Sequence, residues 1–387
     1  MLALDTIKID RLGALLTAVG AAALGFLPFV VVKANRIVPG DPRALFAVLP
    51  APLALACLAT LLLAAIAALR VADARVRLAA ALLGVVVVAL AVAAAANALT
   101  PAGNKVVRIA PGSGFWLLLT GLGLMATDAI TRLRPGPGLR VLFLLAVIAA
   151  AVLALAHGTF NNVSVMREYS VNAGRFAHEA GQHVLLAFGS LGAAVIVAVP
   201  VGILCHRIPR LRAGILGTLN VIQTIPAIAL FGILMAPLGA LAAAVPLAAA
   251  VGIRGIGAAP AVIALFLYSL LPIVANTVVG LKRVSPAAVE AARGMGMTSR
   301  QILTTVELPL ALPVMLTGVR IVLVQNIGLV TIAALIGAGG LGTFVFQGIG
   351  QTAIDLVLLG AIPIVALGFS AAVVLDALVE VMDRTRQ

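Results

Sequence analysis

Apolar runs of about 20 residues recur along almost the whole 387-residue chain, and they constrain its fold more than any other feature. A helix needs about 20 apolar residues to cross the hydrocarbon core of a bilayer. Hydrophobic residues make up 63% of the chain and charged residues 10%, whereas soluble domains carry roughly 25% charged residues. We therefore predict an all-α polytopic membrane protein with about ten transmembrane helices. The predicted crossings are about Gly13–Val32, Ala51–Leu69, Leu78–Asn97, Gly114–Ile130, Leu139–His157, Val184–His206, Ile215–Met235, Gly257–Leu281, Pro313–Leu335 and Leu356–Val379.

The basic residues predict how these crossings are oriented. With the N-terminus inside, 17 of the 26 Lys and Arg residues fall on the cytosolic side, including Lys8 and Arg386 near the two ends. Another 8 fall on the opposite side, and Arg320 lies within a span. Cytosolic loops are enriched in Lys and Arg, so we expect both termini in the cytosol. We interpret the Pro-interrupted stretch Gly239–Ile253 as an outer-face hairpin or interfacial helix, because an eleventh crossing would spoil this asymmetry.

A polar stretch divides the chain into two predicted membrane blocks. Residues 158–182 form the longest polar segment outside the bilayer, and we interpret them as a periplasmic linker. Residues 1–157 form an accessory block of about five spans, and residues 183–387 form a second block of five spans. A separate sensing or scaffold role is one hypothesis for the first block.

Several kinds of chemistry are excluded by the sequence. No Lys follows a Gly, so the chain has no phosphate-binding loop that ends in Gly-Lys. The string Gly337–Gly342 matches GxGxxG but follows a membrane span, and His178 and His183 lie five apart, unlike the histidines of HExxH. No crossing has a carboxylate at its centre, which argues against a proton-driven carrier. We expect no catalytic residue, no metal site and no cofactor on this chain.

The loop between the eighth and ninth predicted crossings, residues 285–309, carries the most informative motif. Ser285 and Pro286 favour a helix start, and Gly294 and Gly296 favour its end. Thr298 and Gln301, three residues apart, form a second capping signal for a short helix toward Pro309. Two short helices joined by a glycine elbow should form a stiff cytosolic projection, with Ala291 and Ala292 leaving one side slim and Glu290 at its rim.

This loop resembles the EAA loop of the permeases of binding-protein-dependent ABC importers. The seven matching positions keep the family's spacing, with Val where the family prefers Ile: Glu290, Ala291, Ala292, Gly296, Val306, Leu308 and Pro309. Gln223-Thr224-Ile225-Pro226, Leu271-Pro272 with Asn276-Thr277, and Ala334–Gly342 are similar to the glycine betaine/choline (osmoprotectant) branch. The resemblance covers about half the chain, from His183 onward, and a longer subgroup of such permeases has extra N-terminal spans.

The resemblance implies a type I ABC importer permease of the bacterial inner membrane. Its EAA loop would dock in a groove on a separate ATPase subunit, one of two that would hold the ATP and Mg²⁺. Further implied partners are a second permease (the same chain or a paralogue) and a periplasmic solute-binding protein. No nucleic-acid partner is expected. Selectivity for a quaternary ammonium osmolyte would reside in the binding protein, because this chain has too few Tyr and Trp residues for an aromatic cage.

Polar residues and glycines of the second block are the candidates for the transport pathway. We expect pathway or gate roles for Gln223, Pro226, Asn276, Gly339 and Gly340, with the two glycines in an outer gate or docking loop. The carbonyls freed by Pro226 and Pro272 could face the pore. The alternative for any single polar residue is a hydrogen bond between neighbouring helices. Arg320 should extend toward the cytosol or pair with Glu307.

Two alternative functions remain at this point. The chain could be an ABC permease for another small solute such as an amino acid. It could also be an ion-coupled secondary carrier whose loop matches by chance.

Overall fold

The structure is a computed structural model that describes residues 10–36, 38–101, 103–104 and 106–384. The predicted cytosolic termini, with Lys8 and Arg386, lie outside the described residues. The chain forms two compact units. Unit 1 contains residues up to 136 together with 145–171 and 351–355, and unit 2 contains 137–144, 172–350 and the residues from 356.

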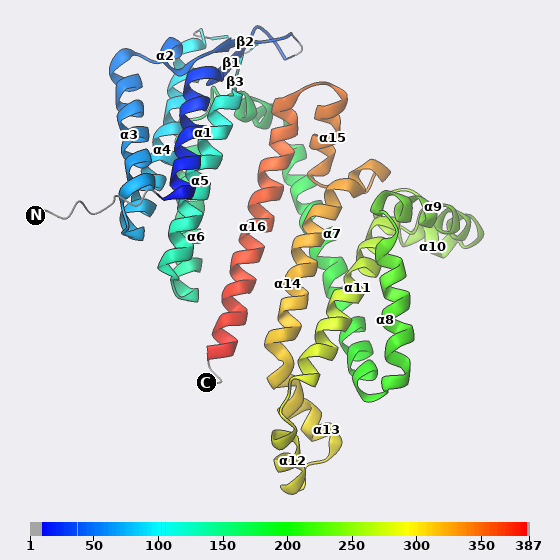
Figure 1. Cartoon of the computed structure of the whole chain (residues 1–387). Coiled ribbons are helices and arrows are strands. Elements are labelled where there is room, and N and C mark those ends of the chain that lie inside the picture. The colour runs from blue at the N-terminus through cyan, green and yellow to red at the C-terminus, as the bar shows by residue number, and fades with distance from the viewer. Residues whose placement is uncertain (1–9, 37, 102, 105, 385–387) are drawn as a thin grey trace, which may run out of the picture. The chain divides into compact units, whose positions relative to one another are not determined.

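Unit 1 is a helical bundle with a small sheet at one end (Figure 1). Its helices are α1 (Arg11–Phe26), α2 (Leu45–Val48), α3 (Ala51–Arg70), α4 (Ala74–Leu99), α5 (Ser113–Leu133) and most of α6 (Pro137–Ala156). The antiparallel strands β1 (Val30–Lys33), β2 (Asp41–Arg43) and β3 (Arg108–Pro111) pair in the order β2-β1-β3. Strands this short show no alternating pattern in the sequence, and for that reason the all-α prediction did not include them.

Four charged side chains join α1, α4 and α5 of unit 1. Arg77 is only 2% exposed, and its Nη1 lies 2.9 Å from Asp10 Oδ2. Arg132 contacts Asp10 through Nη2 at 2.6 Å and Asp128 through Nε at 2.9 Å. Asp10 also caps α1, because its Oδ1 accepts a hydrogen bond from the Gly13 N–H. A buried arginine therefore has carboxylate partners, as a charge removed from water requires.

Unit 2 contains longer helices around one apolar core. They are α7 (Ser164–Arg207, in unit 2 from Asn172), α8 (Pro209–Thr224), α9 (Ala227–Ala244), α10 (Pro246–Ala250), α11 (Ala258–Lys282), α12 (Pro286–Gly294), α13 (Ser299–Gln301), the π-helix η1 (Ile302–Glu307), α14 (Leu308–Ala333), the 3₁₀-helix η2 (Ala334–Ile336), α15 (Gly342–Gly350) and α16 (Ile354–Arg384). Fully buried residues of α7, α11 and α14, among them Ala194, Leu265 and Val322, fill the core.

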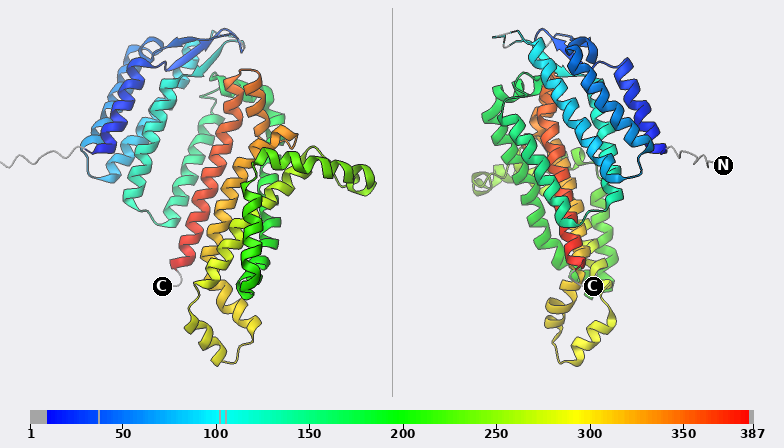
Figure 2. Two further views of the ribbon diagram at one scale, coloured as in Figure 1. Left: turned by 45° about the vertical axis from the view of Figure 1, so that its right-hand side comes forward. Right: turned by 90° about the vertical axis from the view of Figure 1, so that its left-hand side faces the viewer.

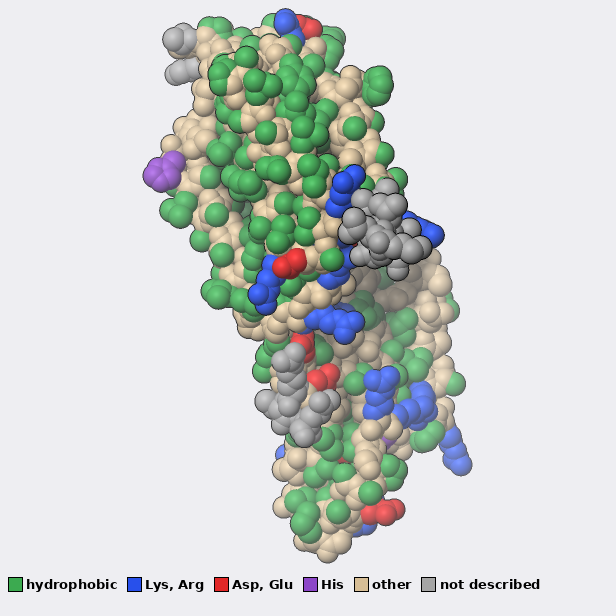
Figure 3. All heavy atoms as spheres, turned by 60° about the vertical axis from the view of Figure 1, so that its left-hand side comes forward, with side chains coloured by type: hydrophobic (Ala, Val, Ile, Leu, Met, Phe, Trp, Pro, Cys, Tyr) green, Lys and Arg blue, Asp and Glu red, His purple; other side chains and the backbone are tan. Residues whose placement is uncertain are grey.

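The polytopic all-α prediction is confirmed for the described part of the chain. Nine of its helices are long and apolar enough to cross a membrane, and α1 is a shorter apolar helix of 16 residues. The space-filling view shows many exposed apolar side chains, with the charged side chains gathered in a few patches (Figure 3).

One predicted boundary is corrected by the structure. The predicted crossing Ile215–Met235 is not one helix, because Pro226 forces Ile225 into an extended conformation and separates α8 from α9.

The stretch Gly239–Ile253 forms the end of α9 and the short α10, which pack against each other as a hairpin. The predicted linker 158–182 is helical from Ser164 onward, as part of α7.

Candidate functional site

The segment α12–α13–η1, here called the finger, projects beyond the ends of α11 and α14 in every ribbon view (Figures 1 and 2). Its first helix begins at Pro286, as predicted. The Ser285 side chain makes no capping hydrogen bond, but the Ser285 carbonyl accepts from the N–H groups of Ala288 and Val289. The start of the finger therefore depends on the backbone and on Pro286 rather than on a serine cap.

Gly296 ends α12 in a Schellman motif. Its φ is +83°, in the left-handed region that glycine adopts without strain. Its N–H donates to the Arg293 carbonyl at 3.0 Å, and the Met297 N–H donates to the Ala292 carbonyl at 3.2 Å. These are the two bonds of the motif, and they satisfy carbonyls that the helix end would leave without donors. The local backbone thus explains why a glycine stands at position 296 of this loop: the chain reverses direction there with a positive φ.

The second helix of the finger begins where the sequence predicts but does not end near Pro309. Thr298 and Gln301 form a reciprocal capping box, in which the Thr298 N–H donates to Gln301 Oε1 at 2.8 Å. Helical structure then continues without a break through η1 into α14. Pro309 stands in the first turn of α14, and the wider π turn precedes it. The finger is therefore continuous with a membrane helix.

The predicted coupling residues divide between the finger's surface and its base. Glu290 and Ala291 are exposed, whereas Ala292 is 1% exposed and packs inward. This corrects the expectation that both alanines form the slim side. The half-buried Val306, Leu308 and Pro309 lie at the base, where Leu308 packs against the cluster of Leu281, Ala311 and Met315.

An ion pair joins the base of the finger to α7. Glu307 is 4% exposed and pairs with Arg207, the last residue of α7. Arg320 does not pair with Glu307, which corrects the alternative considered from the sequence. Its Nη1 instead donates to Asp376 on α16. The finger is thus continuous with α14 and joined to α7 through Glu307, besides its chain connection to α11.

Gln223 satisfies a carbonyl that Pro272 leaves free. Proline has no N–H, so Pro272 cannot donate to the carbonyl of Tyr268 four residues earlier. Gln223 Nε2 donates to that carbonyl at 2.7 Å. The Tyr268 hydroxyl donates in turn to the Ile225 carbonyl, next to Pro226. The carbonyl freed by Pro272 and the Tyr268 hydroxyl thus join the α8–α9 break to α11.

Two amide side chains of the second block, Asn276 and Asn326, also bond within the bundle. Asn276 Nδ2 donates to the Pro272 carbonyl at 2.8 Å within α11. Asn326 is fully buried, and its Nδ2 donates to Ser190 Oγ on α7 and Ser269 Oγ on α11, each at 3.1 Å. Asn326 therefore forms hydrogen bonds between neighbouring helices, which is the alternative that the sequence offered for such a polar residue.

The glycine loop at the other end of α14 is held by a residue that sequence reasoning missed. Glu179 on α7 is 9% exposed, and its Oε2 accepts from the Gly340 N–H at 2.6 Å. Gly339 and Gly340 have φ of +77° and +89°, and a Cβ on either would lie 3.2 Å from Glu179 or His183. The available signal was the four-residue spacing of Glu179 and His183, which places both on one helix face. Since α14 spans about 39 Å, this loop and the finger lie far apart.

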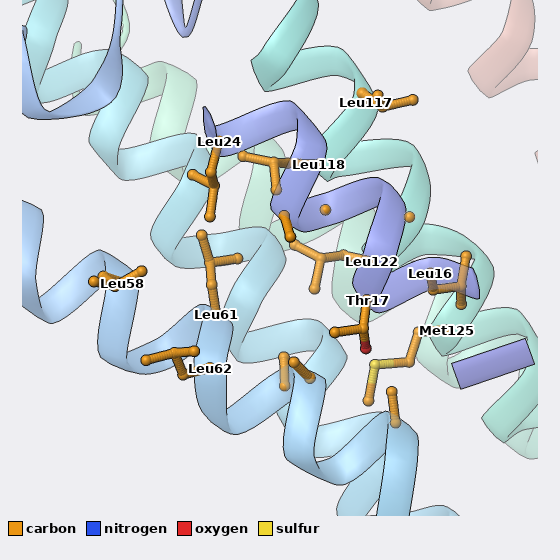
Figure 4. Close-up of a pocket in the computed structure, with 16 residues that line it drawn as sticks. Leu16, Thr17, Leu24, Leu58, Leu61, Leu62, Leu117, Leu118, Leu122 and Met125 are labelled. Carbon is orange, nitrogen blue, oxygen red and sulfur yellow. The ribbon is translucent and has the colours of Figure 1, made fainter. Parts of the chain in front are cut away.

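An apolar pocket lies elsewhere, in unit 1 between α1, α3 and α5. Leucines such as Leu61, Leu118 and Leu122 line it, and its one polar lining residue other than glycine is Thr17 (Figure 4). Its volume is about 120 Å³. Such a lining offers nothing to orient a polar solute. Among the described residues no group of three or more His, Cys, Asp or Glu side chains is placed to hold a metal ion.

Two known families match the chain. Residues 10–166 match the family described as "ABC transporter permease YehY, N-terminal domain". Residues 198–386, which include the finger, match the family described as "Binding-protein-dependent transport system inner membrane component".

Curated relatives resemble the second half of the chain. The osmoprotectant import permease protein OsmW of Salmonella typhimurium is 45% identical over 205 residues, which is 53% of this chain and 88% of that protein. The choline transport system permease protein OpuBD of Bacillus subtilis is 41% identical, over 54% of this chain and 85% of that protein. A solved structure titled as inward-facing MetNI methionine ABC transporter covers 54% of this chain and 95% of its own, at 22% identity and a TM-score of 0.47.

Proposed function

Because this chain belongs to the family of binding-protein-dependent transport system inner membrane components, we propose that it is the permease subunit of an ATP-binding-cassette importer for osmoprotectants such as glycine betaine or choline. It is a multi-pass inner-membrane protein and a transport component rather than an enzyme. The proposal places ATP, Mg²⁺ and hydrolysis on two separate ATPase subunits. A second permease, the same chain or a paralogue, completes the pathway.

The observation that carries the proposal is the finger. It presents Glu290 and Ala291 on its exposed side, and it is continuous with α14. A force applied by a partner to α12 would pass across the Gly296 turn to α13, and then along the continuous helical stretch of η1 and α14 to the glycine loop at the other end. In the proposed orientation both termini and the finger lie in the cytosol, where the ATPase subunits are.

The osmoprotectant assignment is supported by the relatives and by what this chain lacks. The relatives are described as osmoprotectant, choline, carnitine and glycine betaine permeases. The chain has 2 Tyr and 1 Trp, too few for a cage around a quaternary ammonium group. Solute recognition is therefore assigned to a periplasmic binding protein that delivers the solute.

The proposed domain organisation remains the one expected from the sequence. An accessory block covers residues 1–157, a periplasmic segment covers 158–182, and the permease core covers 183–387, with the coupling loop at 285–309. The family matches at 10–166 and 198–386 support this division.

Uptake into proteoliposomes tests the proposal. The chain reconstituted with its ATPase and binding-protein partners should import radiolabelled glycine betaine or choline only with ATP. Glu290→Lys should abolish uptake while the protein stays in the membrane. The matched control is Arg300→Glu, which also reverses an exposed charge of the finger, outside the seven motif positions; it should retain most of the uptake.

Other outcomes identify the alternatives. Uptake driven by an ion gradient without ATPase subunits would establish a secondary carrier and refute the proposal. ATP-driven uptake of an amino acid, with no uptake of glycine betaine or choline, would keep the ABC importer and replace its solute.

A further inference from the structure

Two acidic residues of α16 share a cation from α6. Asp376 and Glu380 are four residues apart and therefore lie on the same helix face. Arg140 Nη1 lies 2.8 Å from Asp376 Oδ2, and Arg140 Nη2 pairs with Glu380 Oε2. The other oxygen of Asp376 accepts a hydrogen bond from Arg320 on α14. Asp376 thus connects α6, through α16, to α14, and all four residues belong to unit 2.

The positions of these charges suit cross-helix pairing and not the stability of their own helices. Arg140 lies in the first turn of α6, where the helix dipole disfavours a cation. Asp376 and Glu380 also repel each other at this spacing. The pairing of Arg140 with the two acids offsets both unfavourable effects, which explains why the charges occur together.

A second contact holds the other end of α16. Asp355 lies in the first turn of α16 and is 2% exposed. The fully buried Ser164 donates to Asp355 Oδ1 at 2.6 Å, and both residues belong to unit 1. A carboxylate near a helix N-terminus interacts favourably with the helix dipole, so Asp355 stabilises α16 itself and also joins it to Ser164 of α7.

Both ends of α16 therefore receive contacts from the segment that matches the N-terminal domain family. Arg140 and Ser164 lie within residues 10–166, whereas Asp355, Asp376 and Glu380 lie within residues 198–386. The curated relatives align with only about half of this chain. We propose that the N-terminal segment serves to position α16, and that Arg140 is the positioning residue that sets α16 against α14.

The Arg140 pairs are only partly exposed, with 28% of the Arg140 and Glu380 side chains accessible. Loss of Arg140 leaves two carboxylates one turn apart with Arg320 as the remaining partner of Asp376. α16 should then be less well fixed against α14. In the importer, whose role rests on the proposed function above, this should lower the maximal uptake rate and leave the affinity for the loaded binding protein unchanged.

Spin labels on α14 and α16 test the positioning directly. Labels at Ile321→Cys and Val374→Cys sit at exposed apolar positions, 45% and 46% accessible, and the buried Cys57 and Cys205 are replaced by alanine. In the full chain, Arg140→Gln should broaden the distance distribution between the labels, and Arg140→Lys should restore it. The maximal uptake rate should fall about threefold, as expected for a partly exposed ion pair.

Arg134→Gln is the matched control, because it removes the same charge from the exposed segment just before α6. If Arg140→Gln leaves the distances unchanged, or if Arg134→Gln broadens them equally, the proposal is wrong. Glu380→Gln provides a second variant should Arg140→Gln fail to fold, and it should also broaden the distribution. The spin-label result does not depend on transport, so a failure of the proposed function would show separately as absent uptake in the unmodified protein.

Discussion

Single residues of the finger and of the α8–α11 contact have roles that follow from backbone chemistry. Gly296 supplies a left-handed conformation at the end of α12. Gln223 supplies a donor for the carbonyl that Pro272 cannot serve. In both cases backbone carbonyls that would otherwise be unpaired receive donors: at Gly296 because the turn it allows brings N–H groups to them, and at Tyr268 because the Gln223 side chain donates.

Gly296→Ala should impair coupling more than Gly294→Ala. A methyl group added at either glycine would meet open space, but only Gly296 has a positive φ. An L-residue in this region costs about 1–2 kcal/mol, whereas alanine within a helix is better than glycine by about 1 kcal/mol. ATP-driven uptake should therefore fall for Gly296→Ala and persist for Gly294→Ala. Equal uptake by the two variants would show that the Schellman turn does not matter for coupling.

Gln223→Leu should destabilise unit 2. The substitution leaves the Tyr268 carbonyl without its donor, at a cost of about 1–3 kcal/mol for a buried polar group. Thermal unfolding in detergent should show a lower midpoint temperature. Gln325→Leu is the control, because Gln325 is also half-buried but lines an open groove between α14 and α16. A similar loss in the control would mean that the Tyr268 contact contributes nothing particular.

At the scale of elements, the helices are held at their ends by charges. The cluster of Asp10, Arg77, Asp128 and Arg132 joins α1, α4 and α5 in unit 1. The hydrogen bond from the Gly13 N–H, together with Arg77 and Arg132, holds the pKa of the Asp10 carboxyl well below its ordinary value. The hydrogen bonds and ion pairs require the ionised form, so they stabilise the folded unit only while Asp10 is charged.

Acid should therefore weaken unit 1 through Asp10. A folded-state pKa below the unfolded one stabilises the protein above about pH 4, and this stabilisation is lost as the pH falls further. Asp10→Asn should lower the unfolding temperature at pH 7, and its difference from the unmodified protein should shrink below about pH 4. Asp41→Asn serves as a control, since Asp41 pairs with Arg43 at the exposed edge strand β2. A constant difference at all pH values would contradict the argument.

At the scale of the whole molecule, the finger and the glycine loop lie at opposite ends of α14, and α16 is held at both of its ends. The relatives align with the second half of the chain, so the core should insert without the accessory block. Deleting residues 1–157 should leave a membrane-inserted permease that imports more slowly, because Arg140 is lost. Proteoliposome uptake measures this, and Arg140→Gln in the full chain should reproduce part of the loss. Unchanged uptake by the truncated protein would remove any transport role for residues 1–157, while an altered salt response would support a sensing role.

The sequence by itself determined the membrane class, most helix positions and the two ends of α12. These are local properties: about 20 apolar residues span a bilayer, proline begins a helix, and glycine tolerates a positive φ. It did not show the sheet, whose strands have three or four residues. It also placed one crossing over the α8–α9 break, because the apolar run continues across residues where the helix is interrupted.

Only the tertiary structure decided which polar groups meet. Glu307 pairs with Arg207, 100 residues away, and Arg320 pairs with Asp376, 56 residues away. Glu179 reaches Gly340 across 161 residues. Local patterns place each side chain on a helix face, but its partner depends on how the helices pack, and buried charges and amides pair with whichever group that packing brings within reach.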